Sequence, residues 1–582
     1  MRNSAGDLKT IRFGTFELAA DAGELRKQGL KIRLQEQPLR VLHMLLANPG
    51  RLVSRDDLRK AVWPSNSYVD FDQGLNRAIN KLREALNDSA ESPRFIETIA
   101  KRGYRFIGDS HTPNATGDSI VVLPFINMSA EPENEYFADG ITEEIINALA
   151  QIKDLHVVAR SSAFSFKGKH VDPRIVGEQL NVRTVLEGSV RRADNQLRIT
   201  VQLVNAADGF HLWSERYDRE MKDVFAIQDE IARSIARRLQ VEAEVDEAAP
   251  LVKPGTQNLE AYQAYVKGRA LLYKRGAAIP RALESCQRAV TLDPEYALAW
   301  AGLADSYTTL GYYGITRPED SMPKAMEAAR RAVAIDPTLA EAHSALAMAS
   351  LMATSNGVEA KAEFLRSIEL NPKYLQAHCW YALFYLQWSE GQLAEGMAQA
   401  KVALVSDPLS SYAHSICAWT CMTVGNIAEA IQVGRRAIEI DSENYIAHVA
   451  LQEALRLGGN LEEAIAIGQL ALAMSGRHAM AMMSRGLTFA DWRKSAEADA
   501  VYCEMVARAR HQYVAPGALA VAASAAAREN DAVRHAREAF ETRDPTCQFV
   551  WSRYFPASGR LYAYRGFREI IALMGSSAWL EN

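Results

Sequence analysis

Short runs of alternating apolar and polar residues open the chain, and longer helical periodicities follow them. The alternation between residues 11 and 34 predicts a small antiparallel sheet. Helices are predicted over 38–47 and from Ser54, whose side chain can cap the second helix together with Asp57. The chain therefore begins with a predicted sheet followed by two helices.

A longer amphipathic helix is predicted over residues 70–86. Its apolar stripe has the spacing of a single helix face and consists of Leu75, Ile79, Leu82 and Leu86. The opposite face carries Gln73, Arg77, Asn80, Lys81 and Glu84, flanked by Asn76 and Arg83. Arginine, lysine, asparagine and glutamine pair with guanine or adenine edges in the major groove of DNA. A solvated surface explains the same polar face, so the helix by itself leaves both interpretations open.

A hairpin with a cationic tip is predicted directly after this helix. Residues 94–100 and 104–107 alternate apolar and polar positions, and Lys101, Arg102 and Gly103 lie between them. Such a tip can lie along a phosphate backbone, so the hairpin favours the DNA-binding interpretation of the helix.

The segments Phe71–Leu86 and Arg102–Phe106 resemble, in order and spacing, the winged-helix DNA-binding domain of OmpR/PhoB-type response regulators. The similarity extends over residues 1–108 and is nearest to the CadC/HilA-like branch, in which this domain is N-terminal. It implies a recognition helix at 71–86, a wing at the hairpin, and contact of the loop 63–69 with RNA polymerase. The helix has fewer arginines than many members of the family, which leaves the set of base-contacting residues open.

Strands and helices alternate between residues 118 and 240. Strands are predicted at 119–125, 155–159, 182–190, 197–204 and 210–217, and helices at 137–152, 173–180 and 224–240. The segments Leu123–Phe125, Phe137–Thr142 and Leu186–Arg191 resemble the TolB N-terminal-like domain of bacterial signalling proteins. This resemblance implies an α/β domain without a specific chemistry.

From residue 258 the chain is repetitive. Asp-Pro or a related pair recurs at 293, 336, 371, 407 and 441, and after a longer first interval the spacing is close to the 34 residues of tetratricopeptide (TPR) repeats. One repeat position carries a small alanine in five repeats, at Ala289, Ala332, Ala403, Ala437 and Ala471. These features are typical of TPR helix pairs, which stack into a solenoid with a concave face. The segment Gly566–Ile571 predicts a closing helix.

The expected fold class is a multidomain α+β protein with a winged helix-turn-helix, then a small α/β domain, then an all-α TPR solenoid. The predicted boundaries are 1–110 for the winged helix, 111–117 for a linker, 118–240 for the TolB-like domain, 241–257 for a second linker, 258–545 for the TPR repeats and 546–582 for the C-terminal capping helices.

Charge is distributed unevenly along the chain. The net charge is −5 over 582 residues, yet residues 1–110 hold 19 lysines and arginines against 14 acidic residues. A basic first domain on an acidic remainder agrees with a DNA-binding module joined to an interaction module. The six cysteines are too scattered for a disulfide framework, and neither a signal peptide nor a membrane-spanning apolar run is found. We therefore expect a cytoplasmic protein without a membrane partner.

Candidate chemistry outside the first domain is weak. Four regularly spaced histidines, His343, His378, His414 and His448, suggest a metal site. They hold the same position in successive repeats, roughly a helix diameter of 10 Å apart, which is too far to share an ion bound at about 2.0–2.3 Å. No nucleotide-binding loop or hydrolase motif is found. We therefore predict no catalytic residue, no metal and no cofactor, and hence no enzyme.

The leading hypothesis is a sequence-specific DNA-binding transcriptional regulator without a receiver domain. The residues expected at DNA bases are Gln73, Asn76, Arg77, Asn80 and Lys81. Those expected at phosphates or on the wing are Arg83, Lys101, Arg102, Tyr104 and Arg105. Besides double-stranded DNA, the expected partners are RNA polymerase, a protein or peptide on the concave face of the TPR array, and a second copy of the chain.

The alternative is a TPR interaction scaffold whose winged helix docks a protein rather than DNA. The low arginine content of the recognition helix favours it, and it predicts no salt-dependent DNA binding by residues 1–110. A third possibility, an enzyme, requires that the α/β domain bind a nucleotide.

Overall fold

The computed structural model of the chain forms two compact units, Met1–Gly117 and Asp118–Asn582. It describes residues 10–574 with gaps, and every structural statement below concerns the described residues. The gaps are 14–15, 20–23, 28–29, 33, 49, 63–70, 87, 90–92, 94, 100–101, 108–109, 112–117, 132–133, 153–154, 194, 222–223, 240–254, 355 and 548–550. The loop 63–69 and Lys101 therefore lie outside the described residues, as does nearly all of both predicted linkers.

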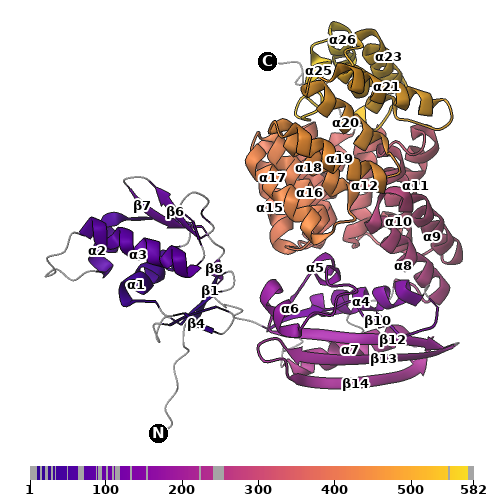
Figure 1. Ribbon diagram of the computed structural model, residues 1–582. Coiled ribbons are helices and arrows are strands. Elements are labelled where there is room, and N and C mark those ends of the chain that lie inside the picture. Colours follow the sequence, from indigo (N-terminus) through magenta and orange to yellow (C-terminus); the bar gives the residue numbers. More distant parts are fainter. Residues whose placement is uncertain are drawn as a thin grey trace. The chain divides into compact units, whose positions relative to one another are not determined.

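The first unit contains two sheets and three helices (Figure 1). The strands are β1 (Thr10–Phe13), β2 (Phe16–Ala19), β3 (Glu24–Lys27), β4 (Leu30–Ile32), β5 (Leu52–Ser54), β6 (Ile96–Ile99), β7 (Gly103–Phe106) and β8 (Ser110–His111). The helices are α1 (Glu36–Leu46), α2 (Arg55–Val62) and α3 (Phe71–Leu86). One sheet has the order β4-β3-β2-β1-β8 and the other β5-β7-β6. His111, which the sequence analysis assigned to the linker, thus belongs to the first sheet.

The core of the first unit forms where the apolar stripe of α3 meets α1 and the sheets. Leu75 and Leu82 are fully buried and Ile79 nearly so, as the helical spacing predicts. Phe13 of β1 packs edge-on against Phe95 and Phe106 at ring distances of 5.7 and 5.3 Å. This aromatic contact joins the N-terminal sheet to the hairpin, so the wing has a fixed base.

The second unit begins with an α/β domain. Its strands are β9 (Asp118–Val122), β10 (Ile126–Asn127), β11 (Leu155–Val157), β12 (Thr184–Ala193), β13 (Gln196–Asn205) and β14 (His211–Glu220). Its helices are α4 (Asn134–Ala150), α5 (Arg160–Phe164), α6 (Pro173–Leu180) and α7 (Val224–Arg238). The sheet order is β11-β9-β12-β13-β14, with β9 parallel to β11 and β12 and the last three strands antiparallel. This is the predicted domain with two short additions, the strand β10 and the five-residue helix α5.

Paired helices make up the rest of the chain. They are α8 (Leu259–Lys274), α9 (Ile279–Leu292), α10 (Ala297–Tyr312), α11 (Pro318–Ile335), α12 (Ala340–Thr354), α13 (Gly357–Leu370), α14 (Leu375–Trp380) continued by the π-helical η3 (Tyr381–Ser389), α15 (Leu393–Ser406), α16 (Ser411–Thr423), α17 (Ile427–Ile440), α18 (Tyr445–Leu457), α19 (Leu461–Met474), α20 (Ala479–Asp491), α21 (Ser495–Ala509), α22 (Pro516–Ala525), α23 (Glu529–Glu541), α25 (Gly559–Tyr562) and α26 (Arg565–Leu573). Consecutive helices pack antiparallel and form hairpins (Figure 1). This arrangement confirms the TPR-like solenoid. No described helix has the length and apolar character needed to cross a bilayer.

The repeated ring position has a structural role. Trp300 Nε1 donates to the Pro294 carbonyl over 2.9 Å, and the ring Nε2 atoms of His343 and His378 make the same contact six residues back, each over 2.9 Å. Each ring thus holds the turn that enters its own helix. Within the described chain, no group of three or more histidine, cysteine or acidic residues is arranged to hold a metal ion.

The α/β domain packs against the first helices of the TPR hairpins. Glu143 on α4 forms ion pairs with Arg160 (2.9 Å) and with Arg269 on α8 (3.0 Å). On α5, Ser162 donates to Asp407 over 2.5 Å, and its Oγ accepts from the Leu409 backbone amide over 2.8 Å. The domain therefore contacts the start of the array at α8, and its middle at the turn between α15 and α16.

Candidate nucleic-acid interface

The polar face of α3 is exposed. Asn76, Arg77, Asn80 and Lys81 all lie on the solvent side of the helix, opposite the buried leucines. Gln73 is part of α3, and its side chain lies outside the described residues. Four of the five side chains expected at DNA bases thus share one accessible helix face.

These exposed side chains differ in how they are held. Lys81 donates from Nζ to Gln35 Oε1 over 2.6 Å, at the beginning of α1. Arg77 and Asn80 make no side-chain hydrogen bond or ion pair with any residue that the structure describes. A donor-rich pair without intramolecular partners is available to base edges without first breaking a contact.

A hydrogen-bonded group connects the helix to the wing. The Tyr104 hydroxyl donates to Asn76 Oδ1 over 3.1 Å, and Arg55 donates to both groups, over 3.3 Å each. The Arg55 backbone amide also bonds to the Arg102 carbonyl at the wing turn. Arg55 therefore fixes the distance between recognition helix and wing. Arg55 is not among the residues predicted from the sequence. Its place directly after the capping Ser54 was a signal, because a cation at a helix N-terminus is unfavourable and needs another partner.

Two expected phosphate or wing residues are buried. Tyr104 is only 4% exposed, so its ring belongs to the core and its hydroxyl to the Arg55 group. Arg83 is 8% exposed and donates from Nη2 to the Ile96 carbonyl (2.8 Å) and Thr98 Oγ1 (2.9 Å). The positions of both side chains disagree with direct DNA contact. The reasons differ: strand β6 covers the flank of α3 that carries Arg83, whereas Tyr104 points from β7 into the core.

The remaining wing cations are accessible. Arg102 is exposed at the turn between β6 and β7. Arg105 is 39% exposed and lies 3.5 Å from Glu97, its cross-strand neighbour. The two facing atoms, Arg105 Nε and Glu97 Oε2, are themselves buried, so a phosphate can reach only the remaining part of the guanidinium. Lys101 lies outside the described residues.

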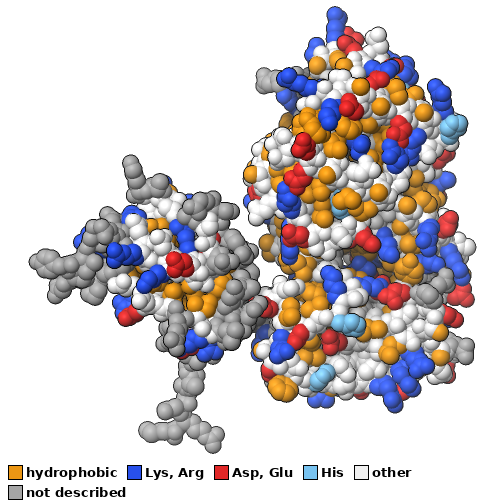
Figure 2. Space-filling model, viewed as in Figure 1, with side chains coloured by type: hydrophobic (Ala, Val, Ile, Leu, Met, Phe, Trp, Pro, Cys, Tyr) orange, Lys and Arg blue, Asp and Glu red, His pale blue; other side chains and the backbone are white. Residues whose placement is uncertain are grey.

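The second unit offers no comparable surface on the face in view. Figure 2 shows its cationic and acidic side chains interspersed there rather than gathered by sign. Nucleic acid binding depends on clustered cations. The exposed face of α3 and the wing turn therefore form the best candidate interface in the described chain.

Two family models match the chain. The model described as "Transcriptional regulatory protein, C terminal" matches residues 29–106, and "HilA/YgeH-like transcriptional regulator, second domain" matches residues 116–234. The first unit therefore contains an OmpR/PhoB-type winged-helix domain, and the TolB-like domain matches the second domain of HilA-like regulators. Both findings confirm the domain types that the sequence patterns predict.

Individual relatives cover parts of the chain. "Putative adenylate cyclase 3" of Rhizobium meliloti is 37% identical over 260 residues, 44% of each protein. The transcriptional regulator HilA of Salmonella typhi is 23% identical over 328 residues, 54% of this chain and 56% of HilA. The structure of the Klebsiella pneumoniae RstA DNA-binding domain in complex with the RstA box is 29% identical and covers 17% of this chain and 97% of that one, with a TM-score of 0.16. The chain spans about half the length of these curated relatives.

Proposed function

We propose that this chain, with its OmpR/PhoB-type first domain and HilA-like second domain, is a sequence-specific DNA-binding transcriptional regulator. The observation that carries the proposal is the pair Arg77 and Asn80, exposed on α3 without partners among the described residues, together with an accessible Arg102 on the wing. A helix that fits the major groove with unpaired arginine and asparagine side chains can read guanine and adenine.

The proposal divides the residues by role. Arg77, Asn80 and Lys81 contact bases, joined by Gln73 and by the amide nitrogen of Asn76. Lys101, Arg102 and Arg105 contact phosphates. Positioning residues, which act through their neighbours rather than on DNA, are Arg55, Arg83 and Tyr104.

The body of the protein supplies the input. Paired TPR helices present surfaces suited to proteins, so we assign a protein partner to the array, with RNA polymerase and a second copy of the chain as further partners. The α/β domain already contacts Arg269 on α8 and Asp407 in the turn after α15, so a partner that binds there competes with Glu143 and Ser162 for their contacts. Binding to chromosomal DNA assigns the protein to the cytoplasm. Both matching family models describe transcriptional regulators, and we assign no enzymatic activity.

The test is selection of DNA from fragmented genomic DNA by the full chain and by residues 1–117, at two salt concentrations. We expect a shared sequence motif, lost in the Arg77→Ala/Asn80→Ala/Lys81→Ala variant. On that motif, Asn80→Ala is expected to cost about 1–3 kcal/mol at a single base position. Arg102→Ala is expected to weaken all sequences alike and to reduce the salt slope by about one.

Arg40→Ala is the matched control for Arg77→Ala. Arg40 is exposed on α1 and pairs with Glu36 over 2.5 Å, so the variant removes one positive charge from the same domain without touching α3. Equal loss of binding in both variants would point to net charge rather than base reading. If neither the full chain nor residues 1–117 retain DNA at low salt, the regulator hypothesis is rejected. The scaffold that docks a protein through its winged helix is then favoured.

A further inference from the structure

An early and a late part of the helical array are in contact. Tyr313, in the loop after α10, packs against Tyr445 of α18 (ring distance 6.4 Å) and edge-on against His478, which precedes α20 (5.7 Å). Gly314, at φ +65°, lies so close to Ala515 that an added Cβ would come within 2.6 Å of the Ala515 Cβ. The early and late hairpins are therefore in direct contact beside the loop 313–317 between α10 and α11, which we call the inserted loop.

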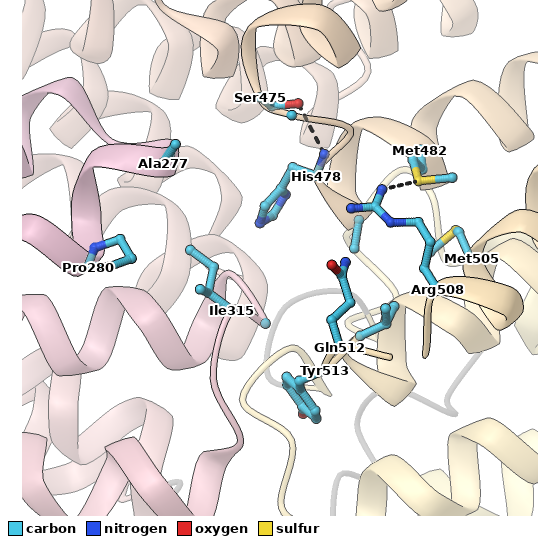
Figure 3. Close-up of a pocket in the computed structure, with 15 residues that line it drawn as sticks. Ala277, Pro280, Ile315, Ser475, His478, Met482, Met505, Arg508, Gln512 and Tyr513 are labelled. Carbon is cyan, nitrogen blue, oxygen red and sulfur yellow. Dashed lines mark hydrogen bonds between the residues drawn. The ribbon is translucent and has the colours of Figure 1, made fainter. Parts of the chain in front are cut away.

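A pocket of about 240 Å³ lies between them. One wall comes from the turn after α8 and the inserted loop, and the other from residues 475–514 (Figure 3). Its volume is below the roughly 300 Å³ at which pockets for drug-sized ligands begin, so it fits a smaller molecule.

Most of the pocket lining is apolar. Pro280 and Ile315 face it from the early wall, and Met482, Met505 and Val514 line the late wall. Methionine side chains adapt their shape to what they contact, so this lining accepts a compact hydrocarbon group without strict shape selection.

Arg508 brings a positive charge to this lining. Its Nη1 donates to the Arg477 carbonyl and, over 3.1 Å, to Met482 Sδ. Its Nε and Nη2 donate to the side-chain oxygen of Gln512 over 3.2 and 2.9 Å, in the amide orientation that pairs donors with an acceptor. All of these acceptors are neutral, and no ion pair joins Arg508 to a carboxylate that the structure describes. The Arg508 guanidinium is therefore hydrogen-bonded, but no described carboxylate neutralises its charge.

The neighbouring ionisable groups do not supply the missing negative charge. Arg477 is paired with Glu504 over 2.6 Å. Burial, reinforced by the Arg508 charge, lowers the pKa of His478 to about 4, so its ring is neutral at pH 7. Figure 3 shows Arg508 and Gln512 reaching from the late wall toward the gap that faces Pro280 and Ile315. The pocket thus combines one uncompensated guanidinium with apolar walls.

We propose that this pocket binds a small monocarboxylic acid with an apolar body. The carboxylate replaces Gln512 as the acceptor for the Arg508 Nε–Nη2 edge, where a guanidinium makes two parallel, charge-assisted hydrogen bonds. The apolar body fills the space between Ile315, Pro280 and the methionines. Because one wall belongs to the early part of the array and the other to the late part, the bound acid links these two parts. This site is independent of the proposed DNA binding.

The test uses the full chain with two probes, sodium phenylacetate and sodium 4-methylpentanoate, and their uncharged amides. Isothermal titration calorimetry is expected to give saturable binding of at least one acid with Kd below about 1 mM, and the acid is expected to raise the thermal midpoint. Each amide is expected to bind at least tenfold more weakly than its acid. Arg508→Gln is expected to weaken acid binding at least tenfold, with Arg508→Lys in between.

Two further variants separate binding from folding. Arg510→Gln removes the same charge from an exposed position two residues away, outside the pocket lining, and is expected to bind as the parent does. Ala277→Phe places a ring in the pocket from an exposed position on the early wall, so we expect an unchanged thermal midpoint and loss of acid binding. The proposal is overturned if neither acid saturates by about 10 mM, if acid and amide bind alike, or if Arg508→Gln and Ala277→Phe leave binding unchanged.

Discussion

Two arginines of the recognition helix differ in burial and therefore in role. Arg77 is exposed and unpaired among the described residues, whereas Arg83 is buried and donates to the wing backbone at Ile96 and to Thr98. Removing one partner of a buried hydrogen bond destabilises the fold more than removing an exposed contact, because the other partner stays buried without a hydrogen bond. The same residue type thus serves recognition at one position and folding at the other.

Arg83→Met is expected to lower the free energy of unfolding of residues 1–117 by about 2 kcal/mol, because the Ile96 carbonyl keeps its burial and loses its donor. Urea unfolding followed by circular dichroism measures it. Arg77→Met, on the exposed face of the same helix, is expected to stay within about 0.5 kcal/mol of the parent. Equal destabilisation by the two changes would contradict the structural role of Arg83.

Sequence reasoning located the exposed residues better than the buried ones. Helical spacing places Arg77 and Asn80 opposite Leu75 and Leu82, and the structure agrees. The same spacing cannot tell that β6 covers Arg83, because that contact depends on how a distant strand packs. The regularly spaced histidines were correctly assigned to repeat positions, but their bonds became visible only in the structure. His343 and His378 bond to proline carbonyls, whereas His414 and His448 bond to the carbonyls of Ser410 and Asn444.

The position of the wing depends on one place where the backbones of strands β7 and β5 come very close together. At Gly103 an added Cβ would lie 2.1 Å from the Val53 carbonyl oxygen, where β7 pairs with β5. Any side chain there must separate the two strands. The predicted hairpin puts this glycine between the two strands, and the structure adds a steric requirement at the first residue of β7.

Gly103→Ala is expected to destabilise residues 1–117 by about 2–3 kcal/mol and to lower DNA affinity through displacement of the wing. Thermal unfolding and DNA binding are measured on the same protein. The neighbouring Arg102→Ala provides the comparison, since it is expected to weaken DNA binding with an unchanged thermal midpoint. A Gly103→Ala protein as stable as the parent would show that β5 and β7 tolerate the extra methyl group.

Element boundaries followed the clarity of the sequence signal. The predicted helix 173–180 coincides with α6, because Asp172 caps it, Pro173 opens it and Asn181 ends it in the left-handed conformation. Helix α5 was missed since five residues carry no periodicity. The π-helical segment Tyr381–Ser389 was also beyond sequence reasoning, because its apolar residues fit any buried helix.

At the scale of the whole molecule, two carboxyl groups of the second unit have raised pKa values. Burial and the neighbouring Glu143 charge raise the pKa of Glu144 to about 7. Burial raises the pKa of Asp305 on α10 to about 7 as well, against the attraction of Arg275. A raised carboxyl pKa favours the folded state most below the unfolded value near 4.5, and the contribution is lost as the pH rises through about 7.

Glu144→Gln is therefore expected to leave the thermal midpoint of the full chain nearly unchanged at pH 5 and to raise it by a few degrees at pH 8. The parent must ionise a buried carboxyl at pH 8, at a cost on the order of 2 kcal/mol, and the variant need not. Differential scanning calorimetry at both pH values measures it. Glu135→Gln, on the same helix but with its carboxylate paired to Lys167, is the control, and no such gain at pH 8 is expected of it.

The bond between Ser162 and Asp407 joins residues that are 245 positions apart. A linear repeat array can form one hairpin after another as it leaves the ribosome, because each hairpin touches only its neighbours. Here the α/β domain is complete at Arg238, long before Asp407 is synthesised, a delay of roughly 8–34 s at 5–20 residues per second. During that interval the inner surface of α4 and α5 is uncovered. The second unit therefore reaches its native state only after most of its chain exists, with the high contact order and slow closure that such a bond imposes.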